Sequence, residues 1–292
     1  MSTFLDSMIA RAKADVKTIV LPEGDDPRTL EAAEKILGEG VAKLIILGDA
    51  AAIAESGRAL DGAQIVDVRT SELRQELADQ LFQIRQHKGM TPEQALEKMD
   101  DVLYFGVMLV KTGRAGDVLR PCLQILKTAP GVKLVSSFFV MVVPNCEFGQ
   151  DGTFIFSDCG LEVQPDAERL AHIAVNSAQS WKTLMGTEPT VALLSHSTYG
   201  SAKNDDAAKV VEAARIAKEL APDLALDGEL QADAAMVPSV GASKAPDSPV
   251  AGKANVLVFP DLDAGNIGYK LVQRLAKAEA YGPVTQGIAA PV

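Results

Sequence analysis

Short apolar runs alternate with amphipathic stretches along most of the chain. Near the N-terminus, residues 18–21 (TIVL) and 43–47 (KLIIL) are runs of β-forming residues and predict buried strands. Between them, residues 28–37 repeat apolar positions at helical spacing, and Asp26 followed by Pro27 is typical of a helix start. A strand, a helix and a strand in this order form a βαβ unit, which predicts a parallel sheet.

The same alternation predicts the remaining elements. Further strands are expected at residues 64–68, 133–135, 138–143, 153–157, 190–194 and 255–259. Further helices are expected at residues 71–87, 92–99, 102–110, 167–184, 206–220 and 264–280. The β-rich stretch 132–159 interrupts the pattern and indicates a change of domain. We therefore predict two α/β domains with parallel-type sheets, one formed by residues 1–143 and rejoined by 285–292, the other by 144–284.

Composition agrees with two folded domains and limits the partners. The chain has 292 residues, of which 47% are hydrophobic, enough for two sizeable cores. Its net charge of -11 argues against binding to nucleic acid or to an anionic membrane surface, because both need clustered Lys and Arg. An anionic small substrate would need a local basic pocket.

The chain shows no signature of export or of metal binding. The three cysteines lack CxxC spacing and the three histidines lack His-x-x-x-His spacing, so we expect neither a disulfide framework nor a metal site. The first ten residues do not have the pattern of a signal peptide, and no apolar run reaches the ~18 residues of a membrane span. We expect a cytoplasmic protein.

One loop and two arginines are candidates for binding an anion. Residues 195–203 (SHSTYGSAK) follow a predicted strand and precede a helix, so their hydroxyl and N–H groups could form an anion cradle, or simply cap the helix. A Ser-His-Asp hydrolase with Ser195 or Ser197 as nucleophile is a weaker reading, because no Gly-x-Ser-x-Gly motif is present. Arg85 and Arg120 could be exposed helix-end charges, or could hold phosphate with two parallel hydrogen bonds.

Several long motifs resemble the phosphate acetyltransferase (phosphotransacetylase) family. They include LPEGDDPRTLEAA near the N-terminus, DGELQADAA at residues 227–235, SKAPDSPVAG at 243–252 and the stretch 253–292. The resemblance covers almost the whole chain. It implies an architecture like that of isocitrate and isopropylmalate dehydrogenases, with an active-site cleft between two domains. It also implies acetyl transfer between acetyl phosphate and coenzyme A by a cytoplasmic homodimer.

The resemblance also assigns individual residues. Two arginines in matching motifs are expected to be catalytic, namely Arg85 in R-x-H-K-G and Arg120 in R-P-x-x-Q-I-x-K-T. Five more positions match residues that bind substrate, namely Ser197, Ser201, Lys203, Lys244 and Tyr281. Cys159 matches a family cysteine, which we interpret as a small buried residue. No metal or organic cofactor is implied, since coenzyme A, acetyl phosphate and inorganic phosphate are substrates and products.

The chain departs from the family pattern in two places. At Ala115–Gly116 a longer family segment is missing, and after Val292 the family continues with an Asn-Asp-Leu-Ser-Arg-Gly segment and a helix that bears a catalytic Asp. The chain as printed is therefore expected to be nearly inactive, whether these segments are deleted or omitted. If they are omitted, Ala115 and Gly116 would lie too far apart for a peptide bond, which needs ~3.8 Å between successive Cα atoms.

Three other functions fit parts of the pattern. A phosphate butyryltransferase would share the fold and mechanism. A non-catalytic domain would bind acetyl-CoA without turnover. A dehydrogenase of the isocitrate type would need a metal-binding cluster of Asp residues, which the sequence does not show.

Overall fold

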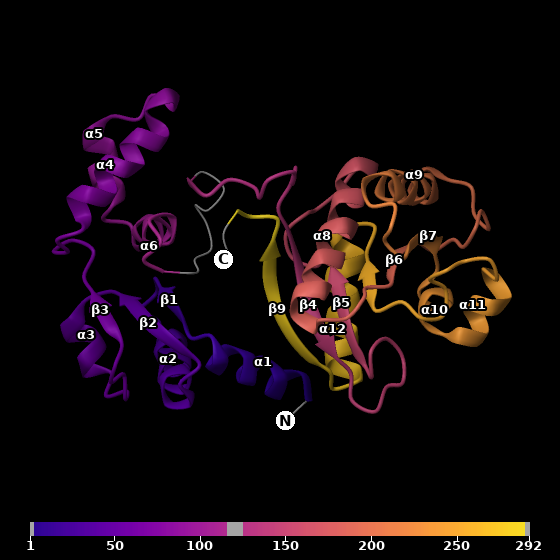
Figure 1. The fold of residues 1–292 in the computed structure, drawn as a ribbon, viewed down its shortest axis with the longest axis horizontal. Helices are drawn as coiled ribbons and strands as arrows, with labels where there is room; N and C mark the ends of the chain where they lie inside the picture. The colour runs from indigo at the N-terminus through magenta and orange to yellow at the C-terminus, as the bar shows by residue number, and fades with distance from the viewer. Residues whose placement is uncertain (1–2, 116–124, 290–292) are drawn as a thin grey trace. The chain divides into compact units, whose positions relative to one another are not determined.

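The computed structural model describes residues 3–115 and 125–289, and these form two compact units (Figure 1). The first unit contains the described residues of Thr3–Pro130 together with Ile288 and Ala289, and the second contains Gly131–Gly287. The division lies after residue 130 and not after residue 143 as predicted, because β4 (Ser136–Val142) belongs to the sheet of the second unit. The predicted cleft between domains stays a prediction.

The first unit is built on a three-stranded parallel sheet, as the βαβ pattern predicted. Its strands lie in the order β1 (Lys17–Leu21), β2 (Ala42–Leu47) and β3 (Gln64–Val66). Its helices are α1 (Thr3–Ala14), α2 (Pro27–Glu39), α3 (Ala50–Glu55), α4 (Arg74–Arg85), α5 (Pro92–Lys98) and α6 (Val102–Lys111), with a 3-10 turn at Gln86–Lys88. The predicted start of α2 is confirmed, since Asp26 accepts a hydrogen bond of 2.8 Å from the Arg28 N–H.

Strand β2 shows why this sequence needs helices on both faces of its sheet. Its side chains point alternately to opposite faces. Leu44 and Ile46 join one buried cluster with Leu30 of α2, whereas Ile45 and Leu47 join a second cluster with residues of α4 and α6. A continuous apolar run is the pattern of a strand buried on both sides.

The second unit is built on a six-stranded sheet in the order β7-β6-β8-β5-β4-β9. Its further strands are β5 (Thr153–Ser157), β6 (Val191–Leu194), β7 (Leu226–Leu230), β8 (Val256–Val258) and β9 (Glu279–Gln286). Strands β5 to β8 are parallel, but β4 runs antiparallel to both β5 and β9. This sheet is therefore mixed and not purely of the parallel type.

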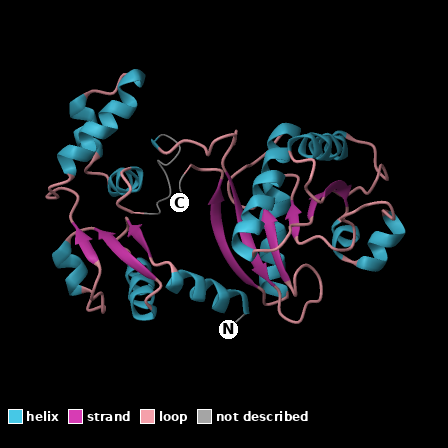
Figure 2. Cartoon of the chain, in the orientation of Figure 1, coloured by secondary structure: helices cyan, strands magenta, loops and turns pink. Residues whose placement is uncertain are grey.

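Helices cover both faces of this sheet (Figure 2). They are α8 (Ala167–Met185), α9 (Asp205–Leu220), α10 (Ala232–Met236), α11 (Pro238–Lys244) and α12 (Leu262–Leu275). On one face, Tyr269 of α12 stacks on Phe139 of β4 with ring centroids 4.1 Å apart. On the other face, the buried Gln286 of β9 donates hydrogen bonds of 2.9 Å to Ser136 of β4 and to Ser177 of α8. This amide holds the edge strand β9 to the sheet and to a helix.

None of the described helices combines the length and the apolar character that crossing a membrane requires.

Candidate functional site

The predicted anion loop, residues 195–203, lies at the carboxyl end of β6. The Ser195 N–H donates a hydrogen bond of 2.8 Å to the Leu230 carbonyl, which ties the start of the loop to the end of β7. Strands β6 and β7 are parallel, so both end at the same edge of the sheet. Ligands of α/β proteins commonly bind at this edge, and the loop is therefore placed as the sequence predicted.

Two predicted serines meet inside the loop, but their surroundings differ. Ser197 is fully buried, its Oγ lies 3.2 Å from the Ser201 Oγ, and it accepts a hydrogen bond of 2.8 Å from the Ala202 N–H. Ser201 is exposed, and its Oγ accepts a hydrogen bond of 3.0 Å from the Thr198 N–H. The hydroxyl of Ser197 thus shapes the loop, whereas that of Ser201 is within reach of a ligand.

The described contacts do not favour a Ser-His-Asp arrangement. His196 is exposed, and its Nε2 lies 3.0 Å from the Nδ2 of Asn204, the residue that caps α9. The histidine next to the candidate nucleophiles is therefore oriented by an amide and not by a carboxylate, unlike the histidine of a catalytic triad.

A left-handed turn at the tip of the loop is fixed by a buried acid that the sequence reasoning did not single out. Tyr199 and Gly200 have φ angles of 46° and 80°. The Gly200 N–H donates to both carboxylate oxygens of Glu229, at 3.1 and 3.2 Å, and Glu229 is only 3% exposed. Because a non-glycine residue rarely adopts a positive φ, the side-chain contact of Tyr199 must help to hold the turn.

Asp227 provides that contact from beneath the loop. Its carboxylate, 2% exposed, accepts hydrogen bonds from the hydroxyls of Tyr199 and Ser248, both at 2.5 Å, and from the Lys218 ammonium at 2.8 Å. Burial by itself would raise the pKa of Asp227, but these three donors outweigh it and hold the pKa below its ordinary value. Burial, together with the hydrogen bond to Asp227, raises the pKa of the Tyr199 hydroxyl.

A signal for this pair of acids was present in the sequence. Asp227 and Glu229 both lie within β7, between the buried Leu226 and Leu230. Two acids in a buried strand require hydrogen-bond partners from neighbouring elements. Here those partners come from the loop, from Lys218 of α9 and from Ser248, which follows α11.

Of the two predicted lysines, Lys203 is the last residue of the loop, whereas Lys244 ends α11. Lys244 donates hydrogen bonds to Gln231 at 3.0 Å and to Asp233 at 2.9 Å, and the hydrogen bond with Lys244 is the main cause that lowers the pKa of Asp233. Gln231 also accepts a hydrogen bond of 3.3 Å from Thr198 of the loop. Lys203 is exposed and lines a depression of about 560 Å³ together with residues of the loop and of α9.

Two other residues of the second unit lie outside this loop. The Tyr281 hydroxyl on β9 donates a hydrogen bond of 2.7 Å to Glu279. Cys159 is fully buried beside Gly265 of α12, and burial raises the pKa of its thiol far above the ordinary range. That pKa agrees with our interpretation of Cys159 as a small buried residue and not as a nucleophile.

The arginines predicted to be catalytic are not part of this loop. Arg85 ends α4 in the first unit, and its buried Nε has no hydrogen-bond partner in the described part of the chain. Arg120 lies outside the described residues, as does Gly116 at the predicted break after Ala115. Their proximity to each other and to the loop stays a prediction.

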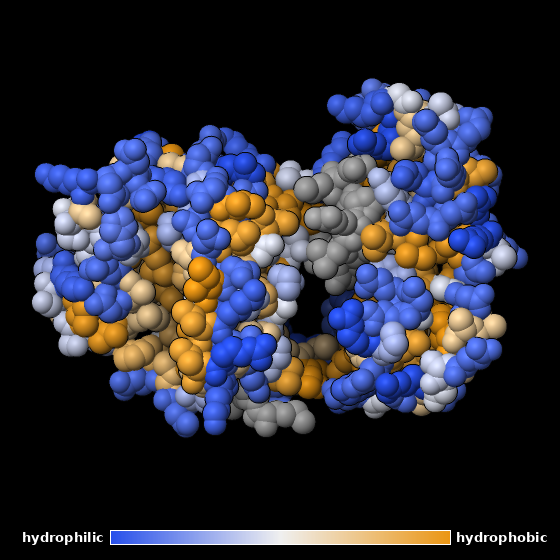
Figure 3. Space-filling view, turned by 180° about the vertical axis from the view of Figure 1, so that it is seen from behind, coloured by the Kyte–Doolittle hydropathy of each residue, from blue (hydrophilic) through white to orange (hydrophobic). Residues whose placement is uncertain are grey.

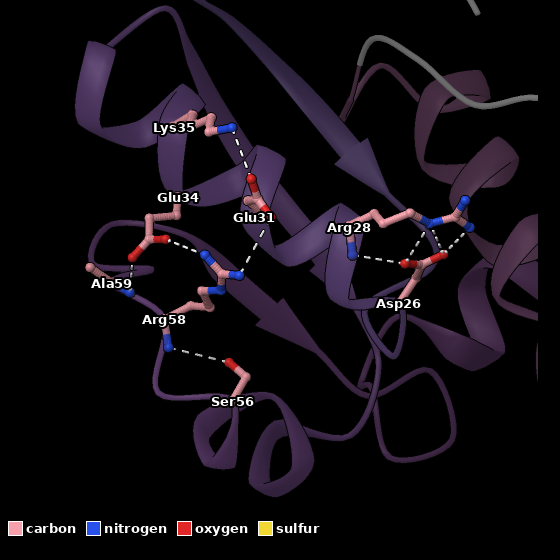
Figure 4. Close-up of polar contacts among 8 residues, drawn as sticks. All are labelled: Asp26, Arg28, Glu31, Glu34, Lys35, Ser56, Arg58 and Ala59. Atoms are coloured by element: carbon pink, nitrogen blue, oxygen red, sulfur yellow. Dashed lines mark hydrogen bonds and ion pairs between the residues drawn. The ribbon is translucent and has the colours of Figure 1, made fainter.

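Other arginines of the first unit are already neutralised by neighbouring acids (Figure 4). Arg28 forms an ion pair of 2.6 Å with Asp26, and its hydrogen bonds lower the pKa of that carboxyl to about 2. Arg58 lies between Glu34 and Glu31, at 2.9 and 3.6 Å. These side chains are less suited to hold a phosphate than Arg85, whose Nε has no partner among residues 3–115 and 125–289.

Within residues 3–115 and 125–289, no group of three or more His, Cys, Asp or Glu side chains is arranged to hold a metal ion.

Comparison with known proteins gives one consistent family. Residues 3–292 match the family described as "Phosphate acetyl/butaryl transferase". A phosphate acetyltransferase of Acetivibrio thermocellus is 55% identical over 99% of this chain and 91% of its own length, and one of Thermoanaerobacterium thermosaccharolyticum is 54% identical over 99% and 92%. The alignment with the first spans 303 positions, more than the 292 residues of the chain, so that relative has aligned residues for which this chain has none.

Solved structures agree in fold. The crystal structure of a phosphotransacetylase from Streptococcus pyogenes is 41% identical, with a TM-score of 0.90, and the match covers 100% of this chain and 92% of that one. The EutD phosphotransacetylase from Staphylococcus aureus is 40% identical, with a TM-score of 0.89 and coverage of 99% and 91%.

Proposed function

The chain belongs to the phosphate acetyl/butaryl transferase family, and we propose that it transfers an acetyl group between acetyl phosphate and coenzyme A. The observation that carries this proposal is 55% identity to a phosphate acetyltransferase along nearly the whole chain. The relatives reported above are named for the acetyl reaction, which favours acetyl over butyryl as the transferred group.

The reaction needs three kinds of group from the protein. The thiolate sulfur of coenzyme A attacks the carbonyl carbon of acetyl phosphate, a C–S bond forms, and the C–O bond to phosphate breaks as phosphate leaves. A base must take the thiol proton, hydrogen-bond donors must stabilise the oxyanion, and cations must hold the departing phosphate. No metal or organic cofactor takes part in the proposed reaction.

We assign the phosphate-binding role to the loop and to two arginines. Ser201 and Lys203 are exposed at the carboxyl end of β6 and can donate to an anion, while Ser197 keeps the loop in shape. Arg85 and Arg120 are proposed to bind the departing phosphate, because a guanidinium keeps its charge at any working pH. Lys244 and Tyr281 are proposed to contact coenzyme A.

A cytoplasmic location and assembly as a homodimer are also proposals. Both are implied by the family resemblance.

The function is tested by incubating the chain with acetyl phosphate and coenzyme A and measuring thioester formation, with butyryl phosphate in parallel. The intact mass of the polypeptide is measured as well. A mass above the 30.8 kDa of these 292 residues would show that the protein in the assay carries further segments. Acetyl-CoA that forms faster than butyryl-CoA supports the proposal. Binding of acetyl-CoA without turnover would support the non-catalytic alternative, and absence of both binding and turnover would overturn the family-based function.

Substitutions then test the assigned roles. We expect Arg120→Ala to lower kcat/KM for acetyl phosphate by about 2 to 4 kcal/mol in transition-state free energy, and Arg120→Lys to recover only part of it. Ser201→Ala and Lys203→Ala should raise KM for acetyl phosphate by roughly tenfold, the loss of about 1.4 kcal/mol of binding. Lys253→Ala, at an exposed lysine elsewhere in the second unit, is the control. Unchanged kinetics of Arg120→Ala would refute the role of this arginine.

A further inference from the structure

His196 is an exposed residue of the loop at residues 195–203 to which the proposed function assigns no role. Its ring Nε2 lies 3.0 Å from the Nδ2 of Asn204, whereas its ring Nδ1 has no hydrogen-bond partner among residues 3–115 and 125–289. Part of the surface of the second unit is covered by hydrophobic side chains, which cannot hydrogen-bond an anion (Figure 3). At the loop, by contrast, His196, Ser201 and Lys203 are exposed polar side chains. His196 therefore presents one free ring nitrogen at the proposed anion site.

The amide of Asn204 is held in one orientation by helix α9. Its Oδ1 accepts a hydrogen bond of 2.9 Å from the Ala207 N–H, which caps the start of the helix. The Nδ2 of the same amide then points to His196. Exchanging the two amide atoms would set an N–H donor against the Ala207 N–H and break the cap. The amide therefore cannot turn over without a cost in stability.

This orientation decides where the ring proton of His196 lies. An amide nitrogen donates hydrogen bonds and does not accept them, so the His196 Nε2 must accept with its lone pair. A neutral imidazole carries a single N–H, and that N–H must then be at Nδ1. A doubly protonated ring would set two donors against each other at 3.0 Å. The free nitrogen of His196 is thus a neutral hydrogen-bond donor.

We propose that the His196 Nδ1–H binds a phosphate oxygen of an acyl phosphate or of inorganic phosphate, and that Asn204 is the positioning residue that keeps the proton on Nδ1. This inference rests on the proposed function and adds to it a binding residue that needs no positive charge. Phosphate oxygens accept hydrogen bonds strongly because they are ionised. The His196 ring contacts Asn204, which directly follows Lys203 in the chain, so the ring donor and the ammonium belong to the same end of the loop.

The backbone on both sides of His196 is anchored. The Ser195 N–H donates a hydrogen bond of 2.8 Å to the Leu230 carbonyl, and the Ser197 N–H donates one of 3.1 Å to the Ser195 Oγ. Together with the contact to Asn204, these bonds hold the ring before a ligand arrives. A donor that is already ordered costs less conformational entropy on binding.

The position of the proton also separates His196 from the base that the reaction needs. A nitrogen that already carries a proton cannot accept the proton of the coenzyme A thiol. The free nitrogen of His196 therefore acts as a donor to phosphate, and another group must be the base.

The ring proton is located by nuclear magnetic resonance of the chain labelled with nitrogen-15 at histidine, without coenzyme A or acetyl phosphate. The chain has three histidines, and the signals of His196 are those that His196→Gln removes. At about pH 8, where a free histidine is neutral, we expect the proton on Nδ1. Asn204→Asp keeps an oxygen for the Ala207 N–H but can only accept from the ring, so it should move the proton to Nε2. A proton on Nε2 in the unchanged chain would overturn the proposal.

Binding of inorganic phosphate is then measured by isothermal titration calorimetry. His196→Gln keeps an acceptor for Asn204 but has no donor in place of Nδ1, so it should weaken binding roughly tenfold, as expected for one hydrogen bond to a charged group. His196→Asn is the matched control, because its amide N–H can replace the Nδ1–H, and it should bind within about twofold of the unchanged chain. The KM for acetyl phosphate should change by the same factors. Far-UV circular dichroism checks that the variants are folded.

These measurements separate the inference from the proposed function. Phosphate binding needs no turnover, so the expected pattern of binding supports the role of His196 even if no acetyl-CoA forms. If acetyl transfer proceeds while His196→Gln binds phosphate as the unchanged chain does, the inference is wrong and the proposed function stands. Equal losses in His196→Gln and His196→Asn, or no phosphate binding by the unchanged chain, would also refute it. Weaker binding by Asn204→Asp with the proton still on Nδ1 would refute the positioning role of Asn204.

Discussion

Replacing Asp227 with asparagine tests whether the buried acid of β7 supports the anion loop. The carboxylate accepts three hydrogen bonds, from Lys218, Tyr199 and Ser248. Hydrogen bonds to a charged group contribute about 1.5 to 3 kcal/mol each, but bonds that share one acceptor do not add. Asparagine keeps one acceptor oxygen, and Lys218, which is 51% exposed, can turn to water. We therefore expect a loss of about 2 to 3 kcal/mol in the free energy of unfolding.

The position of the only tryptophan makes this loss measurable in the second unit alone. Trp181 is fully buried in α8, and its indole N–H donates a hydrogen bond of 3.1 Å to Thr187. Its fluorescence therefore reports unfolding of the unit that contains Asp227. In urea titrations at neutral pH, Asp227→Asn should unfold at lower urea concentration, and its Tm should fall by roughly 5 to 10 °C. Asp223→Asn, at an exposed acid of the same unit, should change the free energy by less than about 0.5 kcal/mol.

The pH dependence gives a second, independent check. The pKa of Asp227 is lower in the folded protein than in the unfolded chain, where it is about 3.9. The carboxylate therefore contributes its full stability above that pH, and the contribution is lost as the pH falls through the folded pKa. The difference between the original chain and Asp227→Asn should shrink in acid. A variant within about 0.5 kcal/mol of the original at neutral pH, or a difference that does not change in acid, would refute this account.

Two further predictions concern α12 and the cysteines. In Gly265→Ala the new Cβ would lie 2.2 Å from the Asp158 carbonyl oxygen, so the free energy of unfolding should fall by about 2 kcal/mol or more. Gly38→Ala is the control, because its new Cβ would enter open space in α2 and should raise the free energy of unfolding by up to about 1 kcal/mol. Urea titrations followed by circular dichroism measure both values. A thiol reagent followed by mass spectrometry should label the half-buried Cys146 well before the buried Cys159, and rapid labelling of Cys159 would contradict its raised thiol pKa.

The elements predicted correctly are those in which local pattern and tertiary packing agree. Strand β2 is a run of apolar residues buried on both faces, and α2 starts at the expected cap, Asp26. The position of the loop at residues 195–203 followed from the same reasoning, because a strand rich in apolar residues precedes it and the capped helix α9 follows it.

The sequence pattern missed the helices α1, α3, α10 and α11, and it missed two strands that depend on distant partners. Strand β9 contains Gly282 and Pro283, which normally argue against a strand, yet it pairs with β4, more than a hundred residues away, and is held by Gln286. Strand β7 contains Asp227 and Glu229, which are poor strand formers, and the donors that stabilise them come from α9, from the loop and from Ser248. These contacts join residues far apart in the chain, so a local sequence pattern cannot predict them. The domain boundary was predicted after residue 143 and not after residue 130 for the same reason.

Asp227 and Glu229 lie next to the loop that we propose as an anion site, in a chain whose net charge is -11. The charge of Asp227 is balanced by Lys218, and the Glu229 carboxylate is directed at the Gly200 N–H. Both acids are thus engaged by groups of the second unit, and they fix a turn that by itself would be unfavourable at Tyr199. The loop therefore gains its shape from buried negative charge, and the phosphate binding that we propose for it would depend on outward groups such as Lys203. Replacing Asp227 should therefore affect the geometry of the loop more than its charge. For that reason the free energy of unfolding, and not only the affinity for substrate, is the quantity to measure.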